Sequence, residues 1–234
     1  MRRTTLLLSK FISIPIILGI YICVALTIVN SAFGWDILYG LPRNDSPGEL
    51  NLRILAGWLF ILFFPHVING ILLSRISLLS VFIRIRIRDT MWYYLLRYKL
   101  CIENTVIWSV ILIGVHSLRS TAKLLAILSV FISHMVMWTL IMMVFDVVLH
   151  ESSISIIIAP AACISFISMA EHFPTIASIV PSSYGMISRS SLFYEKGYSP
   201  YVMVLLNTSI SALCIFVIYL LLRLERCGYE YDRS

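Results

Sequence analysis

Charged side chains are scarce in this sequence. Asp, Glu, Lys and Arg together make up 13% of its 234 residues, whereas hydrophobic residues make up 59%. The surface of a water-soluble domain of this size needs more polar side chains than this chain contains. The composition therefore excludes a soluble globular protein. It predicts an all-α membrane protein, a polytopic helical bundle that forms a single transmembrane domain over residues 1–234.

Motifs for catalysis and energy coupling are also lacking. The chain contains no G-x-x-x-x-G-K-[ST] phosphate loop, so it cannot bind and hydrolyse ATP by that mechanism. His150 and Glu151 begin like the zinc-protease helix H-E-x-x-H, but Ile154 replaces the second histidine. No three His, Asp or Glu residues have metal-ligand spacing. We expect no catalytic residue, no metal and no cofactor in this chain.

Close pairs of cysteines are missing as well. The five cysteines are scattered, mostly within apolar runs: Cys23, Cys101, Cys163, Cys214 and Cys227. Free cysteine packs as a small apolar residue. We therefore interpret these residues as packing groups rather than as disulfide or metal partners.

Long apolar runs make up most of the chain. About 20 mostly apolar residues are needed to cross the ~30 Å hydrocarbon core of a bilayer. Five runs clearly predict spans, at residues 11–33, 54–74, 124–149, 154–170 and 201–222, and a sixth at residues 95–118 predicts one less clearly. We predict six transmembrane helices, with the N- and C-termini both in the cytoplasm.

The run at residues 95–118 is the weakest of the six. Its clean apolar core, residues 104–115, has only 12 residues, which also fits an interfacial or re-entrant segment. The full run includes Arg97, Lys99 and Glu103, whose long side chains can snorkel to the membrane surface. Lys99 and Glu103 are four residues apart, so they share a helix face and can partly neutralise each other.

The distribution of basic residues is asymmetric. With six spans, three Lys and Arg lie at the N-terminus, six between the second and third spans and three at the C-terminus, twelve on one side against six on the other. This bias obeys the positive-inside rule and explains the net charge of +6 without a nucleic-acid partner. Five spans, with the C-terminus outside, preserve the bias equally well. Arg223 and Arg226 directly after the last run favour six.

The segment from residue 75 to 103 is both basic and aromatic. Arg84, Arg86 and Arg88 alternate with isoleucines, and Trp92 and three tyrosines follow. Such a mixture belongs at a membrane surface. Two interpretations stay open, a positively charged topology anchor and a docking element for a cytoplasmic partner.

Four polar side chains are predicted to lie inside the spans. His66 and Asn69 share one helical stripe after Pro65, His134 lies in the fourth span, and Asn207 in the last. Pro65 removes a backbone hydrogen bond and invites a kink. These residues either line a translocation path or make interhelical polar contacts.

The segment from residue 171 to 199 contains prolines and glycines but stays apolar. A fully solvated loop does not need its isoleucines, leucine and phenylalanine. We expect this segment to fold back as short helices that lie on, or dip into, the outer face of the bundle.

The stretch at residues 82–100, FIRIRIRDTMWYYLLRYKL, is similar to the arginine-rich aromatic stretch before the third span in one family. The whole layout resembles the permease subunits of bacterial ATP-binding-cassette exporters of the type-2 membrane family, particularly those of lantibiotic and bacteriocin immunity or peptide export. The resemblance implies that this loop contacts the ATPase, with Arg84, Arg86, Arg88, Asp89 and Trp92 as docking residues.

The same resemblance implies a partner ATPase that binds ATP and Mg, a second permease, identical or homologous, and a bacterial plasma membrane. The expected function is export of an amphipathic or hydrophobic substrate, such as a peptide, an antibiotic or a lipid. The alternative is a stand-alone membrane enzyme or immunity protein without an ATPase, with His66, His134 and Asp146 as candidate chemistry.

Overall fold

The computed structural model describes residues 14–30, 36–41, 52–78, 90–117, 123–149, 152–172 and 180–231. Its helices are α2 (Ile14–Asn30), α3 (Asp36–Tyr39), α4 (Leu52–Leu78), α6 (Thr90–Ser117), α7 (Leu124–Leu149), α8 (Ser152–His172) and α10 (Pro200–Tyr231), with short 3-10 helices η1 (Pro181–Gly185) and η2 (Ile187–Arg189). Within these ranges no strand forms, and the prediction of an all-helical protein is confirmed.

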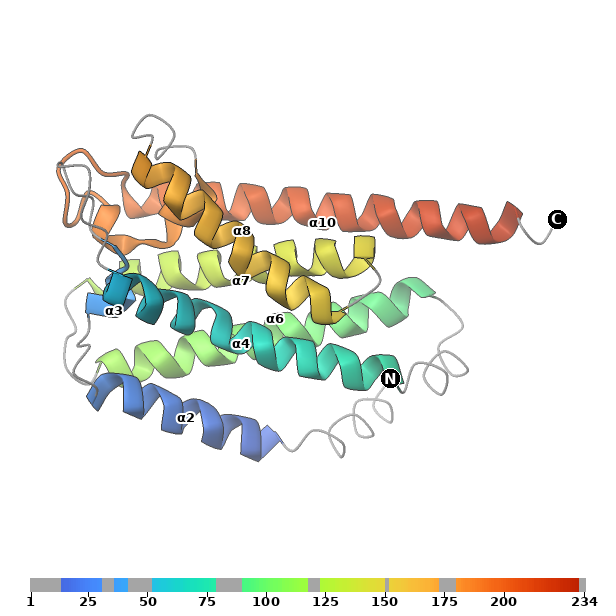
Figure 1. Ribbon diagram of the computed structural model, residues 1–234, viewed down its shortest axis with the longest axis horizontal. Helices are drawn as coiled ribbons and strands as arrows, with labels where there is room; N and C mark the ends of the chain where they lie inside the picture. The colour runs from blue at the N-terminus through green and yellow to red at the C-terminus, as the bar shows by residue number, and fades with distance from the viewer. Residues whose placement is uncertain are drawn as a thin grey trace.

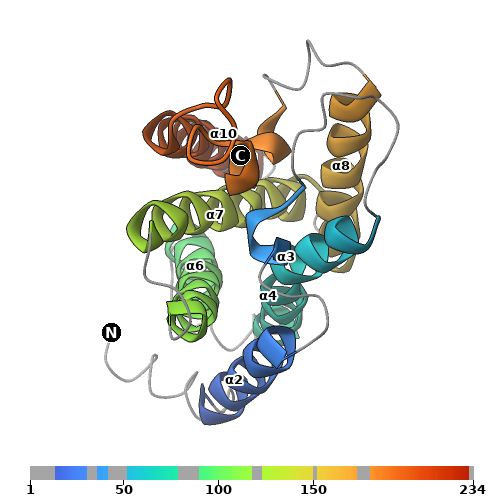
Figure 2. The same ribbon diagram turned by 90° about the vertical axis from the view of Figure 1, so that its left-hand side faces the viewer.

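The long helices lie side by side and alternate in direction (Figure 1). α2 begins and α10 ends at the same end of the bundle, and α3, η1 and η2 gather at the opposite end. Helix α7 lies at the centre, where it packs against α10, α6 and α8 (Figure 2). Helix α6 in turn packs against α2 and α4. A central helix of this kind is apolar on most of its circumference.

Four helices contain segments that are long and apolar enough to span a membrane: Leu52–Ser74, Tyr93–Val115, Leu124–Leu149 and Pro200–Leu224. The segments Ile16–Ile28 and Ile154–Met169 are apolar but shorter. This confirms the expectation of a membrane protein at the level of helix length and composition. The count of six spans and the side on which each terminus lies stay predictions.

The doubtful third span is one of the four long helices. Helix α6 continues without a break from Thr90 to Ser117, so the charged residues before its apolar core are helical. The expected Lys99–Glu103 pair is present, with Lys99 Nζ 3.5 Å from Glu103 Oε1 and both side chains exposed. Arg97 does not snorkel as expected. It is buried, because it forms an ion pair with Asp146 of α7.

Helix α4 passes through Pro65 as a single element, and Trp108 of α6 donates a hydrogen bond to it, with Nε1 3.1 Å from the Ile61 carbonyl oxygen. Gly70 allows α4 to approach α8 closely. A Cβ atom at this position meets the side chain of Ile156. Close packing through small residues is typical of helices in lipid, where no hydrophobic force draws them together.

The segment before α10 closes one end of the bundle, and the prediction that it folds back as short helices is confirmed for residues 181–189, which form η1 and η2. The buried Arg189 of η2 donates from Nε to the Leu41 carbonyl oxygen at 3.2 Å and from Nη1 to Ser183 Oγ at 3.2 Å.

Burial, with a smaller contribution from the neighbouring Tyr198 phenol, raises the pKa of Tyr184 above its ordinary value, so this side chain stays neutral.

Candidate functional site

Of the predicted docking residues, only Trp92 belongs to the part of the chain that the structure describes. Arg84, Arg86, Arg88 and Asp89 are outside the described residues, and Trp92 lies in the first turn of α6, where only the backbone is described. The segment that contains them joins the last residue of α4 to the first residue of α6, and both lie at the end of the bundle where α10 finishes (Figure 1).

Two of the predicted polar residues belong to a chain of hydrogen bonds through the interior. Tyr21 Oη donates to Asn104 Oδ1 at 2.8 Å, Asn104 Nδ2 donates to Asn69 Oδ1 at 2.7 Å, and Asn69 Nδ2 donates to Thr105 Oγ1 at 3.0 Å. The chain goes on through Thr139 Oγ1, 3.0 Å from Thr105 Oγ1, to His66 Nε2 at 3.4 Å. It links α2, α6, α4 and α7.

The two ring nitrogens of His66 have different roles. Nδ1 lies 2.9 Å from the Leu62 carbonyl oxygen, which can only accept, so Nδ1 must hold the proton and Nε2 of the neutral ring is an acceptor. The hydroxyls of Thr105 and Thr139 each have one proton, and each donates to a carbonyl oxygen of its own helix, that of Cys101 and that of Met135, both at 2.9 Å. The contacts from Thr105 through Thr139 to His66 therefore bring polar atoms together without giving the chain a single direction.

The other two predicted residues form a second network. Trp138 Nε1 donates to His134 Nε2 at 3.1 Å, which leaves His134 Nδ1 to donate to Asn207 Oδ1 at 3.4 Å. Asn207 Nδ2 donates to Ser133 Oγ at 3.1 Å and to the Tyr184 carbonyl oxygen at 3.3 Å. The network joins α7, α10 and η1.

Gly185 lets η1 sit directly on His134, because a Cβ atom at this position overlaps the imidazole ring. The ring of Trp58 lies on the same histidine, with centroids 5.7 Å apart. His134 is thus enclosed by α4, α7, α10 and η1. His66, Asn69 and Asn207 are each 0% exposed and His134 1%, so in this conformation none of the four faces a cavity or the lipid.

Asp146, the third residue proposed for a stand-alone membrane enzyme, forms an ion pair with a residue of α6. Arg97 Nη2 lies 3.2 Å from Asp146 Oδ2, with both side chains buried. The Arg97 guanidinium also lies 5.6 Å from the ring centroids of Tyr93 and Tyr94, where the aromatic faces attract a cation. The two histidines and this carboxylate belong to three separate groups of contacts. Among the described residues no cluster of His, Cys, Asp or Glu could hold a metal ion.

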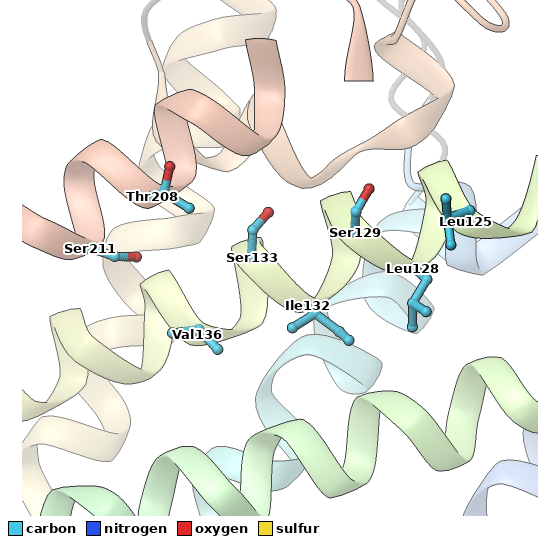
Figure 3. Close-up of a pocket in the computed structure, with 8 residues that line it drawn as sticks. All are labelled: Leu125, Leu128, Ser129, Ile132, Ser133, Val136, Thr208 and Ser211. Carbon is cyan, nitrogen blue, oxygen red and sulfur yellow. The ribbon is translucent and has the colours of Figure 1, made fainter. Parts of the chain in front are cut away.

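Two open apolar depressions, here together called the groove, lie along α7, one beside α10 and one where α6, α7 and α10 meet. One part, here called the hydroxyl depression, has a volume of about 440 Å³. It is lined by Leu125, Leu128, Ser129, Ile132, Ser133, Val136, Thr208 and Ser211. Figure 3 shows Ser129 and Ser133 on the side of α7 that faces α10.

The second part, here called the charged depression, has a volume of about 400 Å³. It is lined by Leu95, Tyr98, Lys99, Ile102, Glu103, Leu140, Ile215, Ile218, Tyr219 and Leu222. Val136 and Leu140 are one turn apart on α7, and Ser211 and Ile215 are one turn apart on α10. The two depressions therefore follow each other along one side of the α7–α10 pair. Both volumes are in the range of about 300–1,000 Å³ that is usual for small-molecule sites.

The sequence alone did not reveal the partners of the predicted polar residues or the groove. The groove could not be seen, because it depends on how far apart α6 and α10 lie over α7. Asn104, Thr105 and Ser109 did offer a signal, since together with Cys101 and Trp108 they form a buried stripe with helical spacing in α6. Their partners on α4 and α7 are far away in sequence and left no local pattern.

Comparisons with known proteins identify no relative of this chain. No family, no curated protein and no solved structure matches the chain. The helices, the groove and the sequence of the loop therefore remain the only guides to the function of this chain.

Proposed function

We propose that this chain is the membrane-spanning permease subunit of an ATP-binding-cassette exporter, which moves an amphipathic or hydrophobic substrate with ATP hydrolysed by a separate subunit. The proposal includes six spans with both termini in the cytoplasm of a bacterium, and a second permease copy or homologue. The observation that carries it is the groove along α7, which is apolar, open on the side of the bundle and large enough for a lipid-like chain.

The position of the basic loop supports the same proposal. Residues 79–89 connect α4 to α6, and the charged depression lies two to three turns along α6. In the proposed mechanism the partner ATPase binds this loop through Arg84, Arg86 and Arg88 and shifts α6 when it closes on ATP. The buried ion pair of Arg97 and Asp146 carries that shift to α7, which forms the floor of the groove.

The test is co-purification from native membranes. The tagged full-length chain is solubilised and its partners are identified by mass spectrometry. We expect a protein with a phosphate-loop motif at near-equal molar ratio. The variant Arg84→Glu, Arg86→Glu, Arg88→Glu should reduce its recovery at least tenfold, because it reverses three charges of the docking loop. A matched control, Arg223→Glu, Arg226→Glu, Arg233→Glu, makes the same charge change in the C-terminal segment and should retain the partner.

Two results contradict the proposal. One is a wild-type chain that co-purifies with no nucleotide-hydrolysing protein. The other is robust transport by the isolated chain in vesicles without any ATPase. Either result would favour a stand-alone membrane protein.

A further inference from the structure

Helix α6 has an exposed ion pair at a depth where charges are unusual. The side chains of Lys99 and Glu103 are 65% and 52% exposed. Glu103 lies ten residues after Tyr93, where the candidate span Tyr93–Val115 begins, which corresponds to about 15 Å along the helix. Hydrocarbon does not solvate such a pair, and charged side chains within a span almost always face protein or a water-filled cavity. This face of α6 is therefore unsuited to contact with lipid alone.

The ion pair belongs to a longer stripe of exposed residues, here called the α6 stripe. Its members recur every three or four residues, the spacing that places side chains on one face of a helix. They are Leu95, Lys99, Glu103, Ile107, Val110 and Gly114. Within the described part of the chain, α2, α4 and α7 pack against other faces of α6. The stripe therefore stays open along 19 residues, or about 28 Å, which is close to the ~30 Å hydrocarbon thickness of a bilayer.

The α6 stripe is shaped for another helix. Leu95, Ile107 and Val110 are 47%, 39% and 52% exposed, so apolar side chains lie on both sides of the ion pair. At Gly114 an added Cβ atom meets nothing within 4 Å. Apolar side chains together with a small residue let two helices approach closely in lipid.

We propose that the α6 stripe binds the same stripe of a second copy of this chain. In a pair related by a two-fold axis along the membrane normal, each residue meets the stripe of the other copy at the same depth. Lys99 and Glu103 are one turn apart, so the long Lys99 side chain of each copy reaches Glu103 of the other. The four charges then alternate around the axis, as the paired charges beside a coiled-coil seam do.

The charges of the stripe select this partner, because they are complementary to themselves. One lysine and one glutamate leave the stripe without net charge, and a second copy supplies an opposite charge to each of them. A partner with charges of a single sign would place one of the two beside a like charge. Leu95, Lys99 and Glu103 also line the charged depression, so this depression borders the proposed interface.

This inference rests on the proposed function only for its second permease, which it identifies as an identical copy bound through α6. The interface needs no ATPase. Recovery of the ATPase and association of the two copies are measured separately, so either proposal can fail while the other holds.

Cysteine cross-linking in native membranes locates the interface and leaves both charges in place. The full-length chain has its five cysteines replaced by alanine, and copper phenanthroline oxidises pairs of introduced cysteines. We expect Val110→Cys to form at least fivefold more covalent dimer than Leu205→Cys. Leu205 is the matched control, because it is 64% exposed on α10 and lies, like Val110, five residues from the same end of the bundle. Ile157→Cys on α8, 70% exposed, should also stay monomeric.

Charge reversal tests the proposed ion pairs. Two copies with different affinity tags are expressed together, and recovery of the second tag with the first is measured after solubilisation. Glu103→Lys in both copies should reduce recovery at least fivefold, and so should Lys99→Glu in both. A Glu103→Lys copy expressed with a Lys99→Glu copy should restore recovery, because two positive charges then face two negative ones. The control Glu195→Lys, at an exposed position at the other end of the bundle, should retain it.

Two results overturn the proposal. One is a yield of covalent dimer from Val110→Cys that is no higher than the yield from Leu205→Cys or Ile157→Cys. The other is a mixed pair of charge variants that associates no better than each variant with itself. A variant that only misfolds is not rescued by a second misfolded variant, so restored recovery in the mixed pair reports the contact itself.

Discussion

At the scale of single residues, four polar side chains inside the bundle are hydrogen-bonded to residues of other elements. His66, Asn69, His134 and Asn207 are spaced so that each presents its polar atoms to a neighbouring element. In hydrocarbon an unpaired polar group is costly, so these residues also define how each helix is rotated about its axis. Asn69 has the most direct role, because it both donates to α6 and accepts from it.

Asn69→Ala should therefore lower the free energy of unfolding by about 1–2 kcal/mol, since it removes two interhelical hydrogen bonds and leaves Asn104 and Thr105 with unsatisfied groups. The measurement is unfolding of the purified chain in mixed micelles, followed by circular dichroism. Ser165→Ala is the matched control, because Ser165 is exposed and donates only to Ala161 of its own helix. Wild-type stability of Asn69→Ala together with a loss of transport would instead assign Asn69 to a translocation path.

At the scale of elements, α6 shows how a charged segment becomes part of a long apolar helix. The first half of α6 contains Arg97, Lys99 and Glu103. From the sequence alone, these charges made it doubtful that the segment spans the membrane. Arg97 is neutralised across the helix interface by Asp146, and two tyrosine rings cover its guanidinium. The pair ties the beginning of α6 to the end of α7.

Asp146→Ala should destabilise the protein by about 3–5 kcal/mol, because it leaves the Arg97 charge buried without its carboxylate. The double variant Arg97→Met, Asp146→Leu removes both charges and should recover most of that loss. Unfolding in mixed micelles at neutral pH measures both. A double variant that is no more stable than Asp146→Ala would show that this contact contributes through packing rather than charge.

The exposed pair of the same helix offers a comparison. Lys99→Ala should change the free energy of unfolding by less than about 1 kcal/mol, because exposed ion pairs contribute little. The contrast between two ion pairs on one helix separates the effect of burial from the effect of charge.

At the scale of the whole molecule, the alternating directions of the long helices place the start of α2 and the end of α10 at one end. If all six cross the bilayer, the two termini share a side. If α6 does not cross, the C-terminus moves to the other side.

Cysteine labelling decides between these arrangements. In a chain whose five cysteines are replaced by alanine, Arg3→Cys and Ser234→Cys should react with a membrane-impermeant maleimide from the same side, and Glu195→Cys from the opposite side. These outcomes follow from six crossings with the termini together. Labelling of Arg3→Cys and Ser234→Cys from opposite sides would support the five-span alternative.

Much of the architecture could be predicted from hydropathy. The run at residues 124–149 coincides with α7, and the run at 54–74 lies within α4. In lipid every backbone group must be bonded within the segment, so a long apolar run has to be a helix. The third run lies within α6, which is long and apolar enough to span a membrane. Its buried ion pair could not be predicted, because the partner of Arg97 lies 49 positions away on another helix and no local pattern reveals it.

The sequence by itself determined that this chain forms apolar helices, because this property follows from which side chains tolerate hydrocarbon. It also placed His66, Asn69, His134 and Asn207 within helices. Only the tertiary structure decided that these residues are enclosed while Lys99, Glu103 and Tyr98 border a groove. Which face of a helix is covered depends on the rotation and spacing of its neighbours, and these are properties of packing rather than of any one segment.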